Sequence, residues 1–480
     1  MLNAWIVTAI TDEHILPDAK PPLVPDGFVI KTAKGETCSA SLCVRSDRPV
    51  ALTAEPTMKQ WTGDVLPSIE LHHVARWWQD GKLVPELLVN DPGFVEPDDK
   101  GNNEFLTDHE DTDEIQPVYL PADHTRQYWV TINVPVECTA GDFTLAIDLK
   151  NGSEIMDQVT YMIQVLPFVL PPSPMQHLFF YRAHLDTSLP PVPERYHKTN
   201  FEYRDDLRNM KAHGITPTLY EHPDSPAFES AIAIRKHEGI PIDPLYLTRL
   251  DVGLNPGWGA VDLVERELTY LRTLHKCAKF GIKQVFGYAT DEAFGDDIPP
   301  QFPYWELARK HDIGIQATAF WGSSANNHIR DLWDQARNRI DTAILQQGNW
   351  WTAELPEIIQ SWQDMGVDIW RYSSREHLKP ATARYRFGLE AYRYGASGTC
   401  PYAYQAQGGP SIWMSRGCSY ALPAKTGPIN TRQMKGYETG IYDVRYAKPL
   451  ESLGGICPVT GGDLYANREA MVGEIMRRMF

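Results

Sequence analysis

The sequence predicts a multi-domain chain in which an all-β part, a β-sandwich, precedes an α/β part, a (β/α)₈ TIM barrel. Residues 1–170 carry short apolar runs that are broken by turn residues, with little helix between them. Residues 175–406 alternate strand-like and helix-like segments eight times. The stretch Leu170-Pro171-Pro172-Ser173-Pro174 cannot continue a helix or a central strand, so it marks the boundary.

The first 170 residues are interpreted as a sandwich because strands recur there without intervening helices. The apolar runs that support this are Ser41–Val44, Tyr128–Val134, Phe143–Leu149 and Thr160–Val165. The acidic and polar segment Pro92–Pro121 is expected to leave the sandwich as a long excursion. Residues 407–480 are expected to form a loop-and-helix extension that packs on the barrel.

The barrel prediction comes from the count and the order of its elements. Several predicted helices end in glycine, which supplies the left-handed residue of a helix exit. We expect strands at His177–Leu185, Thr216–Glu221, Ile242–Leu250, Lys283–Thr290, Gly314–Trp321, Thr342–Gln346, Asp368–Ser373 and Gly398–Tyr404. Helices are expected at Phe201–His213, Phe228–His237, Leu263–Phe280, Tyr304–His311, Asn327–Arg337, Leu355–Met365 and Ala383–Tyr394.

Composition excludes several function classes. The formal net charge of the 480 residues is -17 and no Lys/Arg-rich block occurs, which argues against nucleic acid as a partner. No apolar run is long enough to span a membrane, so a cytoplasmic protein is the default expectation, with secretion through a trimmed signal as the alternative. The oligomeric state has no signature in the sequence.

No cofactor or metal site is expected. The seven cysteines have no repeated spacing, and the histidines at 72, 73, 109 and 124 lack a metal-ligand spacing. A glycine-rich phosphate loop and a Gly-x-Ser-x-Gly elbow are also missing from the sequence.

The most informative stretch is the fourth barrel strand, which ends in the adjacent acids Asp291 and Glu292. Active sites of TIM barrels lie at the C-terminal ends of the strands. Two acids there repel each other and cost desolvation, which favours a functional role. The alternative is that Asp291 caps a helix and Glu292 is merely solvated.

Adjacent residues of an extended segment point in different directions, so this pair can reach two atoms of one substrate. Substrate-assisted hydrolysis of a 2-acetamido sugar needs such a pair, and it is an exception to the usual two-carboxylate mechanism. One carboxylic acid protonates the leaving oxygen, and the other carboxylate holds the acetamido N–H. A neighbouring negative charge favours the protonated state that an acid requires.

The chain as a whole resembles glycoside hydrolase family 123 and the related domain-of-unknown-function 4091 group. The resemblance implies a β-sandwich joined to a TIM barrel, and hydrolysis of β-linked N-acetylgalactosamine by substrate assistance. It implies Glu292 as acid/base and Asp291 as the carboxylate that orients the acetamido group. The similar stretches are Gln127–Thr131, Val134-Pro135, Ala140–Phe143, Val165–Pro171, Asp291-Glu292, Arg386–Gly398 and Glu438–Tyr446.

Other candidates for carbohydrate contact lie at or near predicted strand ends. They are Arg182 late in the first strand, Trp321 at the end of the fifth, Arg371 and Tyr372 at the end of the seventh, Tyr404 at the end of the eighth, and Trp350 and Trp351 just after the sixth. Tyr372 and Tyr404 are suited to holding an acetamido oxygen, and the two tryptophans to stacking on a sugar ring. Packing inside the fold is the alternative role for each of these aromatic residues.

Two rival functions stay open. A double-displacement glycosidase would pair Glu292 with Glu376, which follows the seventh strand. However, Glu376 lies several residues beyond that strand, as a surface residue would. A carbohydrate-binding protein that kept the fold without catalysis is the second rival, because fold does not fix function.

Overall fold

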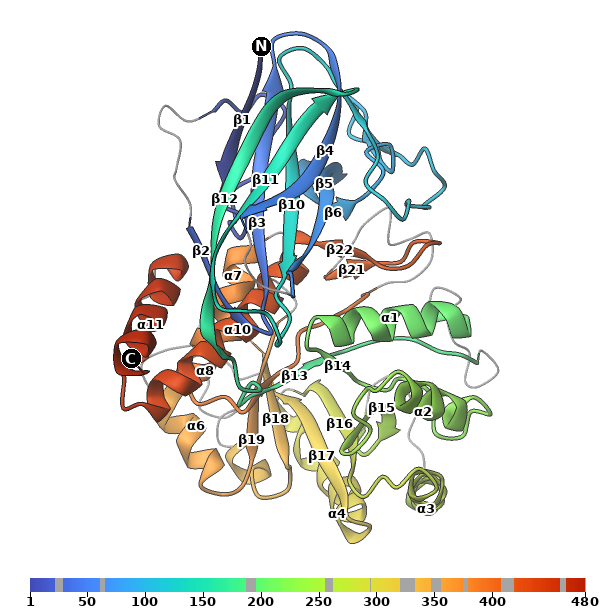
Figure 1. Ribbon diagram of the computed structural model, residues 1–480. Helices are drawn as coiled ribbons and strands as arrows, with labels where there is room; N and C mark the ends of the chain where they lie inside the picture. The colour runs from blue at the N-terminus through green and yellow to red at the C-terminus, as the bar shows by residue number, and fades with distance from the viewer. Residues whose placement is uncertain are drawn as a thin grey trace. The chain divides into compact units, whose positions relative to one another are not determined.

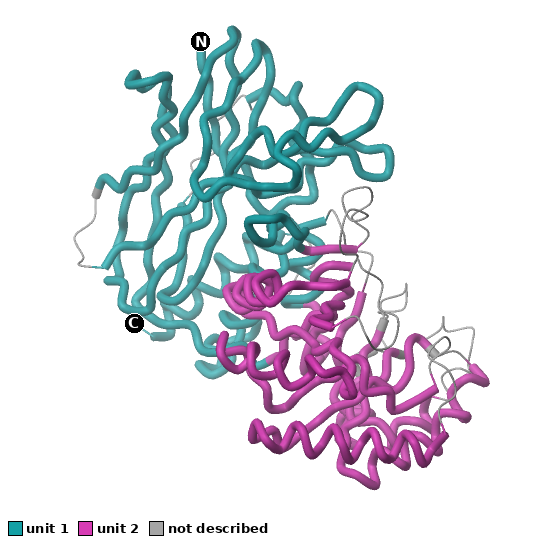
Figure 2. Tube along the Cα trace, turned by 90° about the vertical axis from the view of Figure 1, so that its right-hand side faces the viewer, with its two compact units in different colours: residues 1–174, 376–389, 421–480 teal, residues 175–375, 390–420 magenta. Residues whose placement is uncertain are grey.

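The chain divides into two compact units (Figures 1 and 2). The computed structural model describes residues 1–21, 29–60, 65–186, 196–254, 262–293, 295–319, 333–346, 355–373, 379–406, 418–457 and 463–479. The first unit consists of Met1–Pro174, Glu376–Leu389 and Ala421–Phe480. The second consists of Met175–Arg375 and Glu390–Tyr420.

The first unit is built on two larger β-sheets. A seven-stranded sheet has the order β1-β3-β10-β5-β6-β22-β21, and a five-stranded sheet has the order β2-β12-β11-β4-β9. Neighbouring strands are antiparallel except β2 and β12, and β7 pairs with β8 separately. The strands are β1 (Leu2–Val7), β2 (Val29–Lys34), β3 (Thr37–Ser46), β4 (Val50–Gln60), β5 (Ser68–Gln79), β6 (Lys82–Val89), β7 (Glu96–Pro97), β8 (Asn103–Glu104), β9 (Val118–Leu120), β10 (Thr125–Asn133), β11 (Gly141–Asn151), β12 (Glu154–Val169), β21 (Ala421–Leu422) and β22 (Ile429–Thr431).

Both sheets contribute alternate residues to one hydrophobic core, as strand geometry requires when one face is buried. Tyr128, Val130 and Ile132 of β10 belong to the same buried cluster as Leu145 and Ile147 of β11. The two strands lie in different sheets, so the cluster fills the space between the sheets. The first unit therefore holds the β-domain that the sequence predicts.

The packing of residues 407–480 on the barrel stays a prediction, and residues 421–480 group with the first unit. The reason is visible in the strand pairing: β22 adds to the seven-stranded sheet, with Thr431 opposite Leu87 of β6. This unit also contains helices α7 (Pro380–Tyr385), α10 (Arg432–Ser452) and α11 (Leu464–Met479).

A buried ion network joins these helices to the sheets of the first unit. Asp443 of α10 accepts hydrogen bonds from Arg384 of α7 and from Arg468 of α11, each at 2.6 Å from the Nε atom. Arg468 also contacts Glu36, between β2 and β3, at 2.6 Å. Burial acts to raise the pKa of Asp443, but Arg384 and Arg468 outweigh it and hold that pKa below its usual value. Each buried charge therefore has a partner, as stability requires.

The second unit is an eight-stranded parallel sheet with the order β14-β13-β20-β19-β18-β17-β16-β15. A parallel bridge between Leu219, just after β14, and Leu247 of β15 connects the two terminal strands of that order. The strands are β13 (Gln176–Phe179), β14 (Thr216–Pro217), β15 (Leu245–Asp251), β16 (Val285–Ala293), β17 (Ile313–Ala319), β18 (Thr342–Gln346), β19 (Asp368–Tyr372) and β20 (Gly398–Thr399). Helical segments alternate with these strands along the chain. They are α1 (Asn200–Ala212), α2 (Phe228–His237), α3 (Leu263–Ala278), η2 (Gly295–Asp297), η3 (Pro299–Gln301), α4 (Phe302–Lys310), α6 (Leu355–Gln363), η4 (Arg386–Glu390) and α8 (Ala391–Arg393). Helix α7 also lies between β19 and β20 in the sequence, but it groups with the first unit.

The eight parallel strands confirm the coarse fold class, a mixed α/β chain with additional antiparallel sheets. Side chains from β16 and β19 meet Phe180, which follows β13, in one buried cluster. No helix within the described ranges is both long and apolar enough to cross a membrane.

Candidate active site

Asp291 and Glu292 lie in a β-bulge near the C-terminal end of β16. Thr290 is opposite Ala317 of β17 and Ala293 is opposite Ala319, so two residues of β16 face one residue of β17. A bulge of this kind redirects side chains and is common beside active sites. Glu292 has a φ of +52°, a left-handed conformation that is unfavourable for a residue with a side chain. The local backbone is therefore strained where the two carboxylates emerge.

This geometry differs from the helix-cap alternative. The strand continues through Asp291 and Glu292 to Ala293, and the first helical turn after it begins only at Gly295. Asp291 is exposed and Glu292 is partly exposed. The pair thus lies on the strand end, with both carboxylates reachable from solvent.

Asp291 is held by a tyrosine of its own strand. The Tyr288 hydroxyl donates a hydrogen bond to Asp291 Oδ1 at 2.9 Å, and it lies 2.5 Å from Thr318 Oγ1 of β17. Burial raises the pKa of Tyr288 well above its usual value, and the charge of Asp291 raises it further. Tyr288 therefore keeps its proton and acts as a donor to the carboxylate.

Glu292 has a tyrosine from another strand beside it. Tyr372, at the end of β19, lies close enough to the Glu292 carboxylate for that charge to raise the pKa of its hydroxyl. Burial raises the pKa of Tyr372, and the charges of Glu292 and Asp291 raise it further. The structure thus brings together three of the residues predicted from the sequence, namely Asp291, Glu292 and Tyr372.

Aromatic rings surround the two tyrosines. The Phe180 ring makes edge contacts with Tyr288 at 5.8 Å and with Tyr372 at 6.0 Å, and a tilted contact with Tyr402 at 6.2 Å between ring centroids. Arg182 lies beside this group, with its guanidinium carbon 5.0 Å from the centre of the Tyr402 ring. Rings beside carboxylates are the type of lining that a sugar ring would contact.

Arg371 and Tyr404 lie away from this group. Trp370 and Tyr372 belong to the buried cluster inside the sheet, so the intervening Arg371 points to the opposite face, where it contacts Glu390. Tyr404 is fully buried, and its hydroxyl donates a hydrogen bond to Asn209 of α1 at 3.0 Å. Contact of either side chain with a sugar stays a prediction.

Trp321, Trp350, Trp351 and Glu376 lie outside the described residues. Their proposed roles in sugar stacking, and the role of Glu376 as a nucleophile, stay predictions.

Sequence reasoning missed Tyr288, Phe180 and Tyr402. It also missed a buried pair at the ends of the first two strands, where His184 Nδ1 lies 3.9 Å from Glu221 Oε1. Burial alone would raise the pKa of Glu221, but hydrogen bonds from its neighbours outweigh burial and lower it. Among the described residues, no group of three or more His, Cys, Asp or Glu side chains is arranged to hold a metal ion.

Comparison with known proteins shows a shared fold. A family 123 glycoside hydrolase from Clostridium perfringens, solved in a study of glycolipid glycan hydrolysis, matches with a TM-score of 0.67. The match covers 100% of this chain and 97% of that chain, at 13% sequence identity. The coarse fold expected from the sequence, a parallel eight-stranded sheet together with a β domain, is thereby supported.

Two other solved structures align at scores too low to carry an argument. A family 5 xyloglucanase from Bacteroides ovatus has a TM-score of 0.33 and 7% identity, over 86% of this chain and 98% of that chain. A β-mannanase from Thermomonospora fusca has a TM-score of 0.32 and 14% identity, over 56% and 85%. No protein-family model matches the sequence, and no curated protein matches it.

Proposed function

We propose that this chain is a glycoside hydrolase built on a (β/α)₈ barrel, and that it cleaves β-linked 2-acetamido sugars with retention of configuration. One observation carries the proposal: the adjacent carboxylates of Asp291 and Glu292 emerge together from a strained bulge, with Tyr288 donating to Asp291 and Tyr372 beside Glu292. The fold shared with a family 123 glycoside hydrolase supports it. The substrate would be the sugar at the end of, or within, a glycan.

In this mechanism the substrate supplies its own nucleophile. The acetamido oxygen forms a bond to the anomeric carbon while the bond to the leaving oxygen breaks, and Glu292 gives its proton to that oxygen. Asp291 accepts a hydrogen bond from the acetamido N–H and balances the positive charge of the oxazolinium ion. Water then attacks the anomeric carbon, the ring of the oxazolinium opens, and Glu292 takes the water's proton.

A tyrosine accompanies each carboxylate. Tyr288 donates a hydrogen bond to one oxygen of Asp291 and so fixes its direction. Tyr372, which stands beside Glu292, comes from β19, and two strands, β18 and β17, separate β19 from β16. Holding reacting groups in position before the reaction is a main source of catalytic rate.

Turnover of nitrophenyl β-glycosides, including both N-acetylhexosamine epimers, tests the proposal. Glu292→Gln and Asp291→Asn should each lower kcat by about a hundredfold or more, as loss of general acid catalysis does. Asp297→Asn is the matched control, because Asp297 is an exposed acid six residues after Asp291. Full activity of either site variant would remove the assignment.

Two reagents separate the mechanisms. A thiazoline analogue of the sugar should inhibit competitively if the acetamido group is the nucleophile. A 2-fluoro sugar that labelled Glu376 would instead show double displacement. Sugar binding without hydrolysis across the panel would show a non-catalytic carbohydrate-binding protein.

A further inference from the structure

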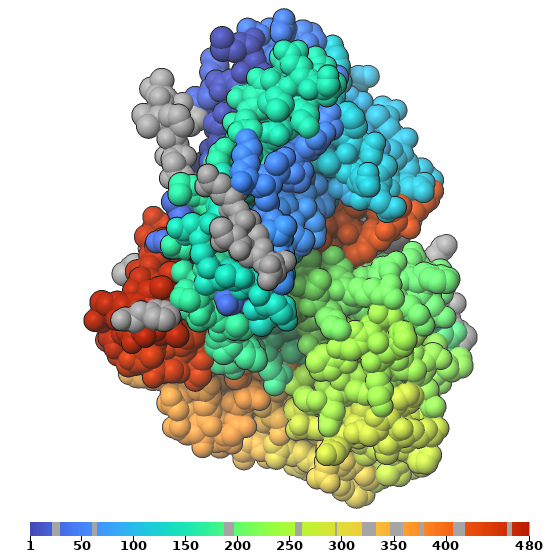
Figure 3. Space-filling view, viewed as in Figure 1, coloured from blue at the N-terminus to red at the C-terminus, as the bar shows by residue number. Residues whose placement is uncertain are grey.

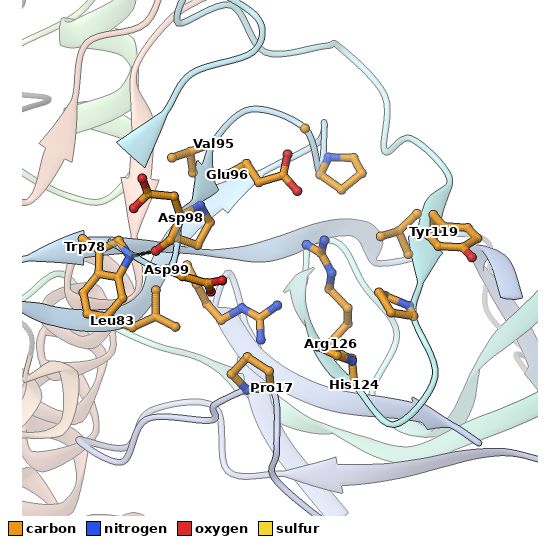
Figure 4. Close-up of a pocket in the computed structure, with 16 residues that line it drawn as sticks. Pro17, Trp78, Leu83, Val95, Glu96, Asp98, Asp99, Tyr119, His124 and Arg126 are labelled. Carbon is orange, nitrogen blue, oxygen red and sulfur yellow. Dashed lines mark hydrogen bonds between the residues drawn. The ribbon is translucent and has the colours of Figure 1, made fainter. Parts of the chain in front are cut away.

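The first unit contains a pocket that is separate from the carboxylate pair. It lies between the strands β5, β6 and β10 and the excursion that connects β6 to β9 (Figure 4). The space-filling view shows part of that excursion, in light blue, at the surface (Figure 3). The pocket volume is about 530 Å³, within the range of small-molecule sites. All residues that line it lie between Pro17 and Arg126, so the pocket belongs to the first unit alone.

Two arginines on neighbouring strands line this pocket: Arg76 on β5 and Arg126 on β10. Both are half-buried. Burial, reinforced by the charge of Arg126, lowers the pKa of Arg76 to about 10, and burial also lowers the pKa of Arg126. Two like charges held close together and away from water disfavour the folded state.

Among the described residues neither guanidinium takes part in an ion pair, although the charge of Glu96, which also lines the pocket, acts on Arg126. Arg76 has a long hydrogen bond of 3.4 Å to the Thr125 carbonyl. Arg45, on the next strand β3, shows the contrast, because it pairs with Asp123 at 3.1 Å. Arg45 therefore has a counter-charge, whereas Arg76 and Arg126 line the pocket without an ion pair. Figure 4 shows the Arg126 guanidinium in the middle of the pocket.

The pocket mouth limits what can enter. Glu96, Asp98 and Asp99 line the side formed by the excursion, and their charges would repel a polyanion but accept hydrogen bonds from hydroxyl groups. The Trp78 ring is fixed there by a hydrogen bond from its Nε1 to the Asp98 carbonyl at 2.8 Å. Tyr119 lies at the other end of the pocket (Figure 4). A small ligand with one negative group and a polar remainder suits this lining.

We propose that this pocket binds a single compact oxyanion, a carboxylate or a sulfate, between Arg76 and Arg126. Guanidinium groups bind such anions through paired, charge-assisted hydrogen bonds. The oxyanion can come from an acidic saccharide or from a free anion. The proposal does not depend on the carboxylate pair of β16 or on hydrolysis.

Calorimetric titration of the full chain tests the proposal with sulfate, acetate, glucuronic acid and glucose at constant ionic strength. Sulfate and glucuronic acid should bind at millimolar concentration, and glucose should not. Arg126→Met and Arg76→Met should each weaken binding about tenfold or more, because each removes a charged hydrogen-bond donor. If glucuronic acid binds more tightly than acetate, the oxyanion belongs to an acidic saccharide. If the two bind equally, the pocket recognises the free anion.

Thermal unfolding and a second arginine provide the controls. Arg126→Met should leave Tm unchanged or raise it, because the variant lacks a desolvated charge without a partner. Arg48→Gln removes an exposed arginine of the same unit and should leave binding unchanged. The proposal is overturned if no anion binds, if glucose binds as well as glucuronic acid, if Arg48→Gln weakens binding equally, or if Arg126→Met unfolds the protein.

Discussion

Removing the Tyr288 hydroxyl tests whether the position of Asp291 matters to turnover. The phenol donates a 2.9 Å hydrogen bond to the carboxylate, and phenylalanine keeps the ring that fills the buried cluster. A hydrogen bond to a charged group contributes about 1.5–3 kcal/mol. If that energy holds Asp291 for the acetamido group, Tyr288→Phe should lower kcat/KM by about 10- to 150-fold.

A second tyrosine of the same cluster distinguishes positioning from simple packing. Tyr246→Phe is the matched control, because Tyr246 is also 6% exposed in the same cluster and its hydroxyl donates to the neutral Gln176 side chain at 2.7 Å. Wild-type kinetics for Tyr288→Phe, or an equal loss for Tyr246→Phe, would refute the reasoning.

Other predictions concern stability. Asp443→Asn should lower the free energy of unfolding by about 3 kcal/mol in denaturant titration, because it leaves the buried Arg384 without its counter-charge and Arg468 with Glu36 alone. The pKa of Asp443 is lower in the folded protein than in the unfolded chain. Its contribution to stability is therefore present above the unfolded pKa and is lost on acidification below about pH 4. Asp443→Asn should weaken this pH dependence of the unfolding free energy. Gly253→Ala should unfold the protein or abolish turnover, because the added Cβ would lie 1.6 Å from the Ala289 carbonyl oxygen. Gly473→Ala in α11 meets no atom within 4 Å and should stabilise the helix by about 0.5–1 kcal/mol, measured by the same titration.

Strand periodicity could have refined the predicted site further. Asp368–Tyr372 forms β19 within one residue of the predicted strand. Adjacent residues of a strand point to opposite faces, so Arg371 and Tyr372 could not both face the same site. Trp370 is hydrophobic and therefore marks the face of β19 that points into the core. Tyr372, two residues later, lies on the same face. The same alternation places Phe286 and Tyr288 on the inner face of β16, where the structure has them.

Features that depend on distant segments could not be predicted in this way. β20 contains only Gly398 and Thr399, so the direction of Tyr404 is set by irregular backbone and by Asn209 of α1 rather than by alternation. The bulge at Asp291 arises from a register shift against β17, which one strand alone does not reveal. Similarly, the placement of residues 421–480 depends on β22 finding β6, more than 300 residues earlier in the chain.

The positions that disfavour folding are also the positions to which we assign function. Glu292 adopts a left-handed backbone that costs about 1–2 kcal/mol, and its neighbour Asp291 carries the same charge. A glycine at position 292 would remove the backbone strain, and a neutral residue would remove the repulsion between the two acids. Packing therefore explains neither cost. In contrast, Asp443 is just as charged and far more buried, yet each of its oxygens has a guanidinium partner. A charge whose partners are complete is accounted for by the fold, whereas a strained backbone beneath two adjacent acids at a strand end is the kind of feature that function explains.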